Sequence, residues 1–167
     1  MKYILILFVL LTSCNHLSQA QETEVTTYYL IRHAEKDRSN PSEKNPHLDA
    51  DGLKRAENWI AILSNITFDA IYSSDYHRTK ETAQPTATRN NLDITLYNPS
   101  TINVQEFANN TKGKTVLVVG HSNTIPAFVN GLIGSKKYEN IDDAVSGHLY
   151  IVTIIGDKIH DQLLVIE

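Results

Sequence analysis

The sequence has little cysteine, no surplus of positive charge and no apolar run that is long enough to span a membrane. One of its 167 residues is a cysteine, so no disulfide can form within the chain and no cysteine cluster can hold a metal ion. With 15 basic and 19 acidic residues the net charge is −4, which argues against a nucleic-acid-binding protein. The apolar run at 3–11 has nine residues, whereas a membrane-spanning helix needs about 20.

The remaining composition is typical of one globular domain. Hydrophobic residues make up 41% and charged residues 20% of the chain, which does not fit a disordered protein. A length of 167 residues is close to that of an average domain, and it is sufficient to bury a core without disulfides. The sequence shows no internal repeat and no second domain.

The N-terminus has the features of an export signal. Lys2 precedes the apolar run at 3–11, and small residues follow it. The segment Leu11-Thr12-Ser13-Cys14 resembles the lipobox of bacterial lipoproteins, which implies cleavage before Cys14 and acylation of its thiol. The alternative is an ordinary secretory signal cut near Ala20, with Cys14 incidental.

The lipobox interpretation divides the chain into a signal peptide (1–13), a polar tether (14–26) and a domain (27–167). The lipid on Cys14 would anchor an exported protein to a membrane, on the periplasmic or cell-surface side, without a spanning segment. The sequence leaves open which membrane and which face.

Strand and helix patterns alternate through the domain. This order predicts an α/β fold, a three-layer α/β/α sandwich with a mostly parallel central sheet and an antiparallel C-terminal hairpin. Asp49 or Asp51 is placed to cap the first helix, and Pro85 should kink the second helix or begin a new one. We expect strands at 26–31, 68–73, 94–97 and 115–119, helices at 51–64, 78–90, 101–109 and 124–132, and the hairpin at 149–155 and 158–166.

Three predicted strands end in residues that can handle phosphate. The first is followed by Arg32 and His33, the second by a segment that contains Arg78, and the fourth by Gly120 and His121. In an open α/β sheet, ligands bind beyond the carboxyl ends of the strands. We therefore expect two histidines and two arginines to meet at one end of the sheet.

Such a group of residues suits phosphoryl transfer without a metal. Guanidinium groups offer forked donors to the oxygens of an anion, and nearby positive charge keeps an imidazole neutral and nucleophilic. An imidazole nitrogen can attack phosphorus to form a covalent intermediate. Gly120 would let the backbone approach the ligand closely.

Three segments resemble motifs of the histidine phosphatase superfamily: 29–36, 72–83 and 118–124, with a further likeness at 48–56. The resemblance implies a phosphatase of the histidine acid phosphatase type, a phosphoric monoester hydrolase that needs no metal and no cofactor. It implies that His33 is phosphorylated, that Arg32 and Arg78 bind the phosphoryl oxygens, and that His121 contacts the phosphoryl group.

The sequence departs from this family at the general acid. Many members carry Glu or Asp just after the third strand, where this chain has Asn98 and Pro99. Glu106 lies 28 residues beyond Arg78 but in no matching motif, and Glu35 is close to His33 in the sequence. Both are candidates, and the acid stays unassigned. A missing acid would favour phosphoramidates or activated esters over alkyl phosphates.

Other interpretations remain at this point. A zinc site built from His33, His121 and an acid is conceivable, but the arginines would repel the cation. His47 and His77 are expected at the surface. Instead of a phosphatase acting on a small phosphorylated substrate or a phosphoprotein, the chain could be a phosphate-binding lipoprotein without turnover, or a phosphomutase. The oligomeric state cannot be predicted.

Overall fold

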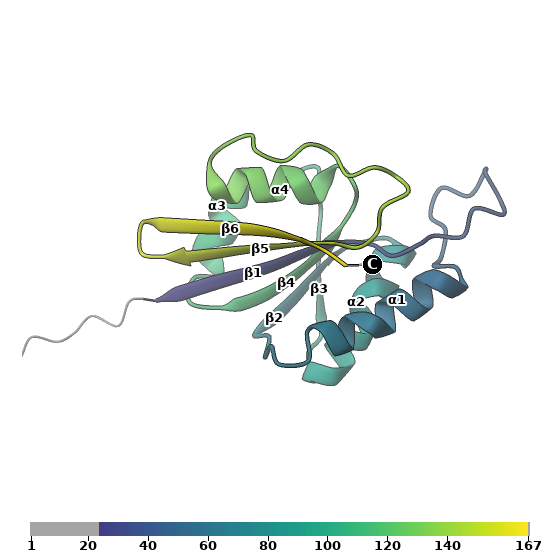
Figure 1. Cartoon of the computed structure of the whole chain (residues 1–167), viewed down its shortest axis with the longest axis horizontal. Coiled ribbons are helices and arrows are strands. Elements are labelled where there is room, and N and C mark those ends of the chain that lie inside the picture. Colours follow the sequence, from purple (N-terminus) through teal and green to yellow (C-terminus); the bar gives the residue numbers. More distant parts are fainter. Residues whose placement is uncertain (1–23, 167) are drawn as a thin grey trace, which may run out of the picture.

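The computed structural model describes residues 24–166, which form one six-stranded mixed sheet covered by helices on both faces (Figure 1). The strands lie in the order β3-β2-β4-β1-β5-β6. Strands β1 to β4 are parallel, whereas β5 and β6 form an antiparallel hairpin at one edge. The strands are β1 (Val25–Arg32), β2 (Ala70–Ser74), β3 (Ile94–Tyr97), β4 (Thr115–Gly120), β5 (His148–Ile155) and β6 (Lys158–Val165).

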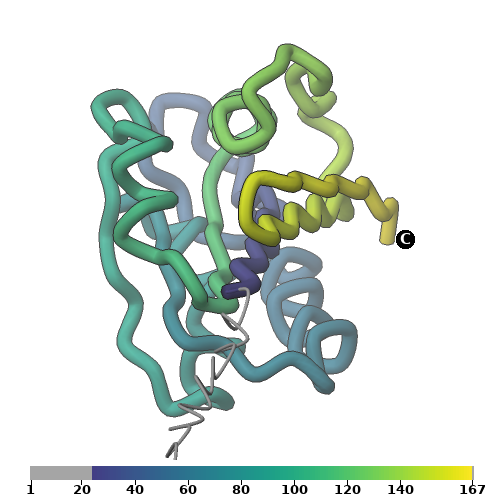
Figure 2. Tube along the Cα trace, turned by 90° about the vertical axis from the view of Figure 1, so that its left-hand side faces the viewer, coloured from purple at the N-terminus to yellow at the C-terminus, as the bar shows by residue number. Residues whose placement is uncertain are grey.

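Two helices lie on each face of the sheet, as the predicted α/β/α sandwich requires. They are α1 (Ala50–Ile62) and α2 (His77–Asn90) on one face, and α3 (Val104–Asn110) and α4 (Thr124–Ile133) on the other. From the side, α4 (green) and α1 (blue) lie on opposite sides of the β5–β6 hairpin (yellow) (Figure 2).

Alternation along the strands divides the core into two hydrophobic layers. In β1, Leu30 packs in the layer beneath α3 and α4, whereas Ile31 packs in the layer beneath α1 and α2. Phe128 of α4 and Trp59 of α1 are central members of the two layers, and Trp59 is fully buried. Burial of both strand faces explains why β4 is a nearly continuous apolar run.

Local signals in the sequence set most element boundaries. Asp49 caps α1, because its side chain accepts a hydrogen bond from the Gly52 backbone N–H at 2.8 Å. Gly134 ends α4 and Gly156 turns the hairpin, both with the positive φ that favours glycine. Helix α3 begins three residues later than predicted, since Asn103 Oδ1 caps it by accepting from the N–H groups of Gln105 and Glu106.

The expectation that Pro85 begins a new helical piece is wrong, because α2 runs through it as one helix. Proline removes a single backbone donor. The buried face of α2 holds the helix to the sheet on both sides of this position; it consists of Thr79, Thr82, Ala83, Thr86 and Ala87.

The signal peptide at 1–13, Cys14 and all but the last residues of the tether lie outside the described residues. Val25 and Thr26 already belong to β1, so the domain begins slightly before the predicted boundary. Among residues 24–166, none of the helices has the length and apolar character needed to cross a membrane.

Candidate active site

The carboxyl ends of β1, β2 and β4 bring the candidate residues to one edge of the sheet. Arg32 at the end of β1 is in register with Gly120 at the end of β4, and the His33 backbone N–H donates to the Gly120 carbonyl oxygen at 2.8 Å. The rings of His33 and His121 are therefore neighbours, with centroids 5.4 Å apart and planes inclined by 70°. Arg78 lies in the first turn of α2, which follows β2, and its guanidinium group contacts the His121 ring.

His33 is held as a neutral imidazole with one free nitrogen. Its side chain is 4% exposed, and Nδ1 lies 2.7 Å from the carbonyl oxygen of Ala34. A carbonyl can only accept, so Nδ1 carries the proton and Nε2 keeps its lone pair. Burial lowers the pKa of His33 to about 3, and nearby Arg32, Arg78 and His121 act in the same direction, against the Ala34 hydrogen bond.

His121 has the opposite tautomer. Arg78 Nη2 lies 3.5 Å from Nδ1 of His121 and can only donate, so Nδ1 is the acceptor. Nε2–H then donates to Ser74 Oγ at 3.0 Å, and Ser74 Oγ donates to Thr79 Oγ1 at 3.1 Å. Burial lowers the pKa of His121 to about 4, with further contributions from nearby positive charge.

Arg78 has donors that no described residue satisfies. Its Nε and Nη1 atoms are buried without a hydrogen-bond partner among residues 24–166, and its Cζ lies 4.6 Å from the centre of the Tyr76 ring. Unpaired guanidinium donors are costly to bury unless a ligand accepts from them. These donors are available to the oxygens of an anionic ligand.

Arg32 also holds the loop before β5 in place. It is 2% exposed, and its Nη1 donates to the backbone oxygens of Asp142 at 2.8 Å and Val145 at 2.6 Å, while Nη2 donates to Asp143 Oδ1 at 2.6 Å. Arg32 thus anchors the loop before β5 through three of its five N–H groups, and its Nε–H lacks a partner among the described residues.

Among the described residues, neither candidate general acid is hydrogen-bonded to His33 or His121. Glu35 forms an ion pair with Arg55 of α1, with Nε–Oε1 and Nε–Oε2 distances of 2.8 and 3.1 Å. Glu106 is exposed in the first turn of α3. The structure therefore assigns no role in proton transfer to either carboxylate.

Two further residues shape the site, and the motif at 72–83 contains one of them. Thr82 Oγ1 accepts from the Ala34 N–H at 2.9 Å and donates to the Arg78 carbonyl oxygen at 2.7 Å, which joins the nucleophile segment to α2. Tyr97 is a reason for glycine at position 120 that the sequence did not indicate. A Cβ at Gly120 would lie 2.7 Å from the Tyr97 hydroxyl oxygen. Gly120 makes room for a tyrosine as well as for a ligand.

The family model described as histidine phosphatase superfamily (branch 1) matches residues 28–98. This segment contains Arg32, His33 and Arg78, the residues whose geometry is described above. This part of the chain therefore has the sequence pattern of the histidine phosphatase superfamily. Among curated proteins, none matches this sequence.

Solved structures described as phosphatases and as a phosphoglycerate mutase have the same fold. A candidate alpha-ribazole-5'-P phosphatase from Escherichia coli is 16% identical, with a TM-score of 0.70 over 84% of this chain and 96% of that chain. A phosphoglycerate mutase from Bacillus anthracis is 15% identical, with a TM-score of 0.66 over 85% and 93%. A candidate phosphohistidine phosphatase, SixA, from Agrobacterium tumefaciens is 20% identical, with a TM-score of 0.60 over 84% and 98%. At these identities the likeness extends to the fold alone.

Proposed function

We propose that this protein is a phosphatase that hydrolyses a phosphoester or phosphoramidate through a phosphohistidine at His33, without a metal ion in the reaction. One observation carries the proposal: a buried, neutral imidazole with a free Nε2 lies in a group of residues whose guanidinium donors lack partners. A nucleophile and an oxyanion site are the two parts that phosphoryl transfer requires.

The first step forms a bond between Nε2 of His33 and phosphorus and breaks the bond from phosphorus to the leaving oxygen or nitrogen. Nδ1–H stays bonded to the Ala34 carbonyl, which stabilises the positive charge that the ring acquires. Arg78, with its unpaired Nε and Nη1, binds non-bridging oxygens of the phosphoryl group, and Nε of Arg32 offers one more donor. Water then attacks phosphorus, so that inorganic phosphate leaves and His33 regains its lone pair.

His121 contributes a lone pair or a charge beside the phosphoryl group. Its Nε2–H is fixed by Ser74, so Nδ1 is the nitrogen that remains for the site. A bound phosphorylated substrate would take the place of Arg78 Nη2 beside Nδ1 of His121. The negative charge of its phosphoryl group would raise the pKa of the His121 imidazole. Protonated His121 would then donate to a phosphoryl oxygen.

The surroundings of Glu35 and Glu106 support a preference for substrates with good leaving groups. Glu35 is committed to Arg55, and Glu106 is exposed on α3. Without a positioned acid, the leaving group must depart without a proton from a carboxyl group. Phosphoramidates and aryl or acyl phosphates meet this condition better than alkyl phosphates. The same reasoning disfavours a phosphomutase, which must protonate and deprotonate alcohols.

The main alternative is a protein that binds phosphate or a phosphometabolite without turnover, and one experiment separates it from an enzyme. The purified protein is assayed in EDTA with an aryl phosphate and with an alkyl phosphate, and phosphate binding is measured by calorimetry. The proposal expects turnover of the aryl ester, slow turnover of the alkyl ester, and loss of both in His33→Ala. Tight phosphate binding with no release of the aryl alcohol would support the alternative.

We also infer that residues 1–13 direct export and that Cys14 carries a lipid. This proposal rests on the order of a positive residue, a short apolar run and Cys14 in the sequence. The test is fractionation of cells that express the full chain. The wild type is expected in the membrane fraction and Cys14→Ser in the soluble exported fraction; an unchanged distribution would rule out lipidation.

A further inference from the structure

A second group of chemically active side chains lies outside the phosphoryl site. His77 and Glu81 are four residues apart on α2, so they share one face of the helix. His47 comes from the loop that precedes α1, and its ring stacks on that of His77 with centroids 4.1 Å apart and an angle of 15°. One ligand atom from each of these three side chains lies within 4.8 Å of those from the other two.

Hydrogen bonds hold the segments that carry these side chains together. Glu81 Oε2 accepts from the Leu48 N–H at 2.8 Å, and Oε1 is hydrogen-bonded to Nδ1 of His47. Asn45 Oδ1 accepts from the His77 N–H at 3.0 Å, which holds the start of α2 against the same loop. Such supporting hydrogen bonds orient the ligands in protein metal sites.

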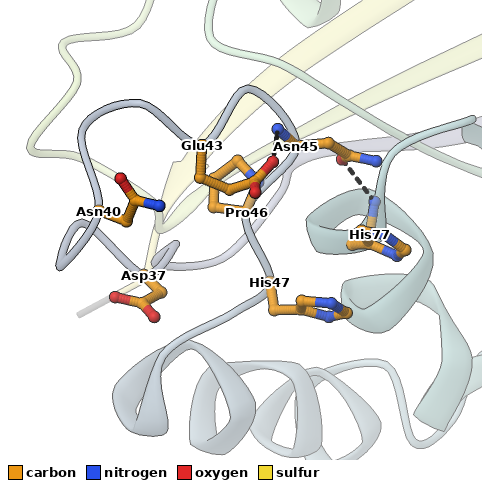
Figure 3. A pocket seen from close by; sticks show the side chains of 7 residues that line it. All are labelled: Asp37, Asn40, Glu43, Asn45, Pro46, His47 and His77. Atoms are coloured by element: carbon orange, nitrogen blue, oxygen red, sulfur yellow. Dashed lines mark hydrogen bonds between the residues drawn. The ribbon is translucent and has the colours of Figure 1, made fainter.

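The surroundings favour a cation. A cavity of about 200 Å³ opens beside the two histidines (Figure 3), and its described lining contains two carboxylates and no lysine or arginine. The lining consists of Asp37, Asn40, Glu43, Asn45, Pro46, His47 and His77.

We propose that His47, His77 and Glu81 form a binding site for a divalent transition metal, with Zn²⁺ as the preferred ion. Two imidazoles and one carboxylate are a common zinc ligand set, which leaves a fourth position for water on the side of the cavity. Imidazole ligands select zinc and its neighbours over Mg²⁺ and Ca²⁺, which prefer oxygen. His47 is exposed and His77 partly exposed, so their rings can turn to reach bonds of about 2.0–2.2 Å at little cost.

The ion would connect two segments of the chain, the loop between β1 and α1 and the first turn of α2. His47 belongs to the loop between β1 and α1, and His77 immediately precedes Arg78. A bound metal would hold this loop against the first turn of α2 and fix the helix start that carries Arg78. The site does not depend on the phosphatase proposal, because the lining of its cavity contains none of His33, Arg78 and His121.

The test uses the purified, tag-free full chain in a phosphate-free buffer after EDTA treatment and dialysis. ZnCl₂ binding is measured by calorimetry, CoCl₂ binding by visible absorption, and MgCl₂ serves as the comparison ion. The proposal expects one zinc per chain, cobalt bands of four- or five-coordinate geometry, and much weaker binding of magnesium.

Variants locate the site. His47→Ala, His77→Ala and Glu81→Gln should each weaken zinc binding by at least about tenfold, whereas His160→Ala, an exposed histidine on β6, should leave it unchanged. Circular dichroism in EDTA verifies that each variant is folded. The proposal is overturned if zinc does not bind, if the three variants bind it as the wild type does, or if binding is lost in the double variant His33→Ala/His121→Ala.

Discussion

Nδ1 of His33 lies 2.7 Å from the carbonyl oxygen of Ala34, the residue that follows it in the chain. This short bond decides which nitrogen of the imidazole is free. It assigns the proton to Nδ1 and leaves Nε2 unprotonated. The tautomer of the proposed nucleophile is therefore set by its own backbone segment and not by a neighbouring acid.

Replacement of Arg78 by lysine should impair catalysis although it keeps the charge. Lysine cannot reproduce the two donors, Nε and Nη1, that lack partners among the described residues. We expect kcat/KM for an aryl phosphate to fall by about 10²–10³, or about 2.7–4 kcal/mol. Arg89→Lys is the matched control, because Arg89 lies at the other end of α2 and contacts only backbone oxygens of the α1 region. Equal effects of the two substitutions would contradict the role given to Arg78.

Acidification should destabilise the protein in a way that depends on His33. The unfolded chain binds a proton at this residue as the pH falls through about 6.5, but the folded protein does so only near pH 3. The stability associated with neutral His33 is thus present above pH 6.5 and is lost as the pH falls below it. At about 1.4 kcal/mol per pH unit, His33 alone should lower the free energy of unfolding by about 2 kcal/mol between pH 6.5 and pH 5.

Urea unfolding at several pH values measures this dependence. The free energy of unfolding of the wild type should fall by about 2 kcal/mol more between pH 6.5 and 5 than that of His33→Gln. The exposed His160 provides the control, since His160→Gln should keep the wild-type slope. Parallel slopes for wild type and His33→Gln would mean that burial does not depress the pKa of His33.

Several features could be predicted from the sequence because they depend on neighbouring residues. The cap by Asp49, the end of α4 at Gly134 and the hairpin turn at Gly156 all follow from side-chain or backbone preferences within a few positions. The order of strand and helix patterns also predicted the layers and the parallel arrangement of β1 to β4. The continuity of α2 through Pro85 could not be predicted, because it depends on packing against the sheet.

The site could be predicted only in part, for the same reason. The sequence indicates which residues follow the strands, but the partners of Arg32 come from an irregular loop 110 to 113 positions away. No periodicity marks such a loop, so these contacts of Arg32 could not be predicted from the sequence. The meeting of His47 with His77 also depends on the path of a loop, and the sequence alone predicted two unrelated surface histidines.

Gly52→Ala should destabilise the domain through the backbone that follows the nucleophile. A Cβ at this position would lie 2.1 Å from the Glu35 carbonyl oxygen, and backbone cannot turn away as a side chain can. We expect a loss of about 1–3 kcal/mol in the free energy of unfolding, measured by urea denaturation.

Gly131→Ala in α4 is the comparison for this variant. Its Cβ would meet Val104 side-chain atoms at 3.1 Å, and the helix gains from alanine. The free energy of unfolding of Gly131→Ala should therefore differ less from the wild type than that of Gly52→Ala. If Gly52→Ala is as stable as the wild type, the close approach of α1 to Glu35 is not a constraint on this fold.

The most direct test of the central claim is detection of the covalent intermediate. The purified protein is mixed with an aryl phosphate, quenched within its first turnovers in alkali, in which phosphohistidine persists, and analysed by mass spectrometry. The account predicts one phosphate on His33 that is lost on acid treatment and is absent from His33→Ala. Release of the aryl alcohol without any phosphate on His33, or with undiminished rate in His33→Ala, would contradict it.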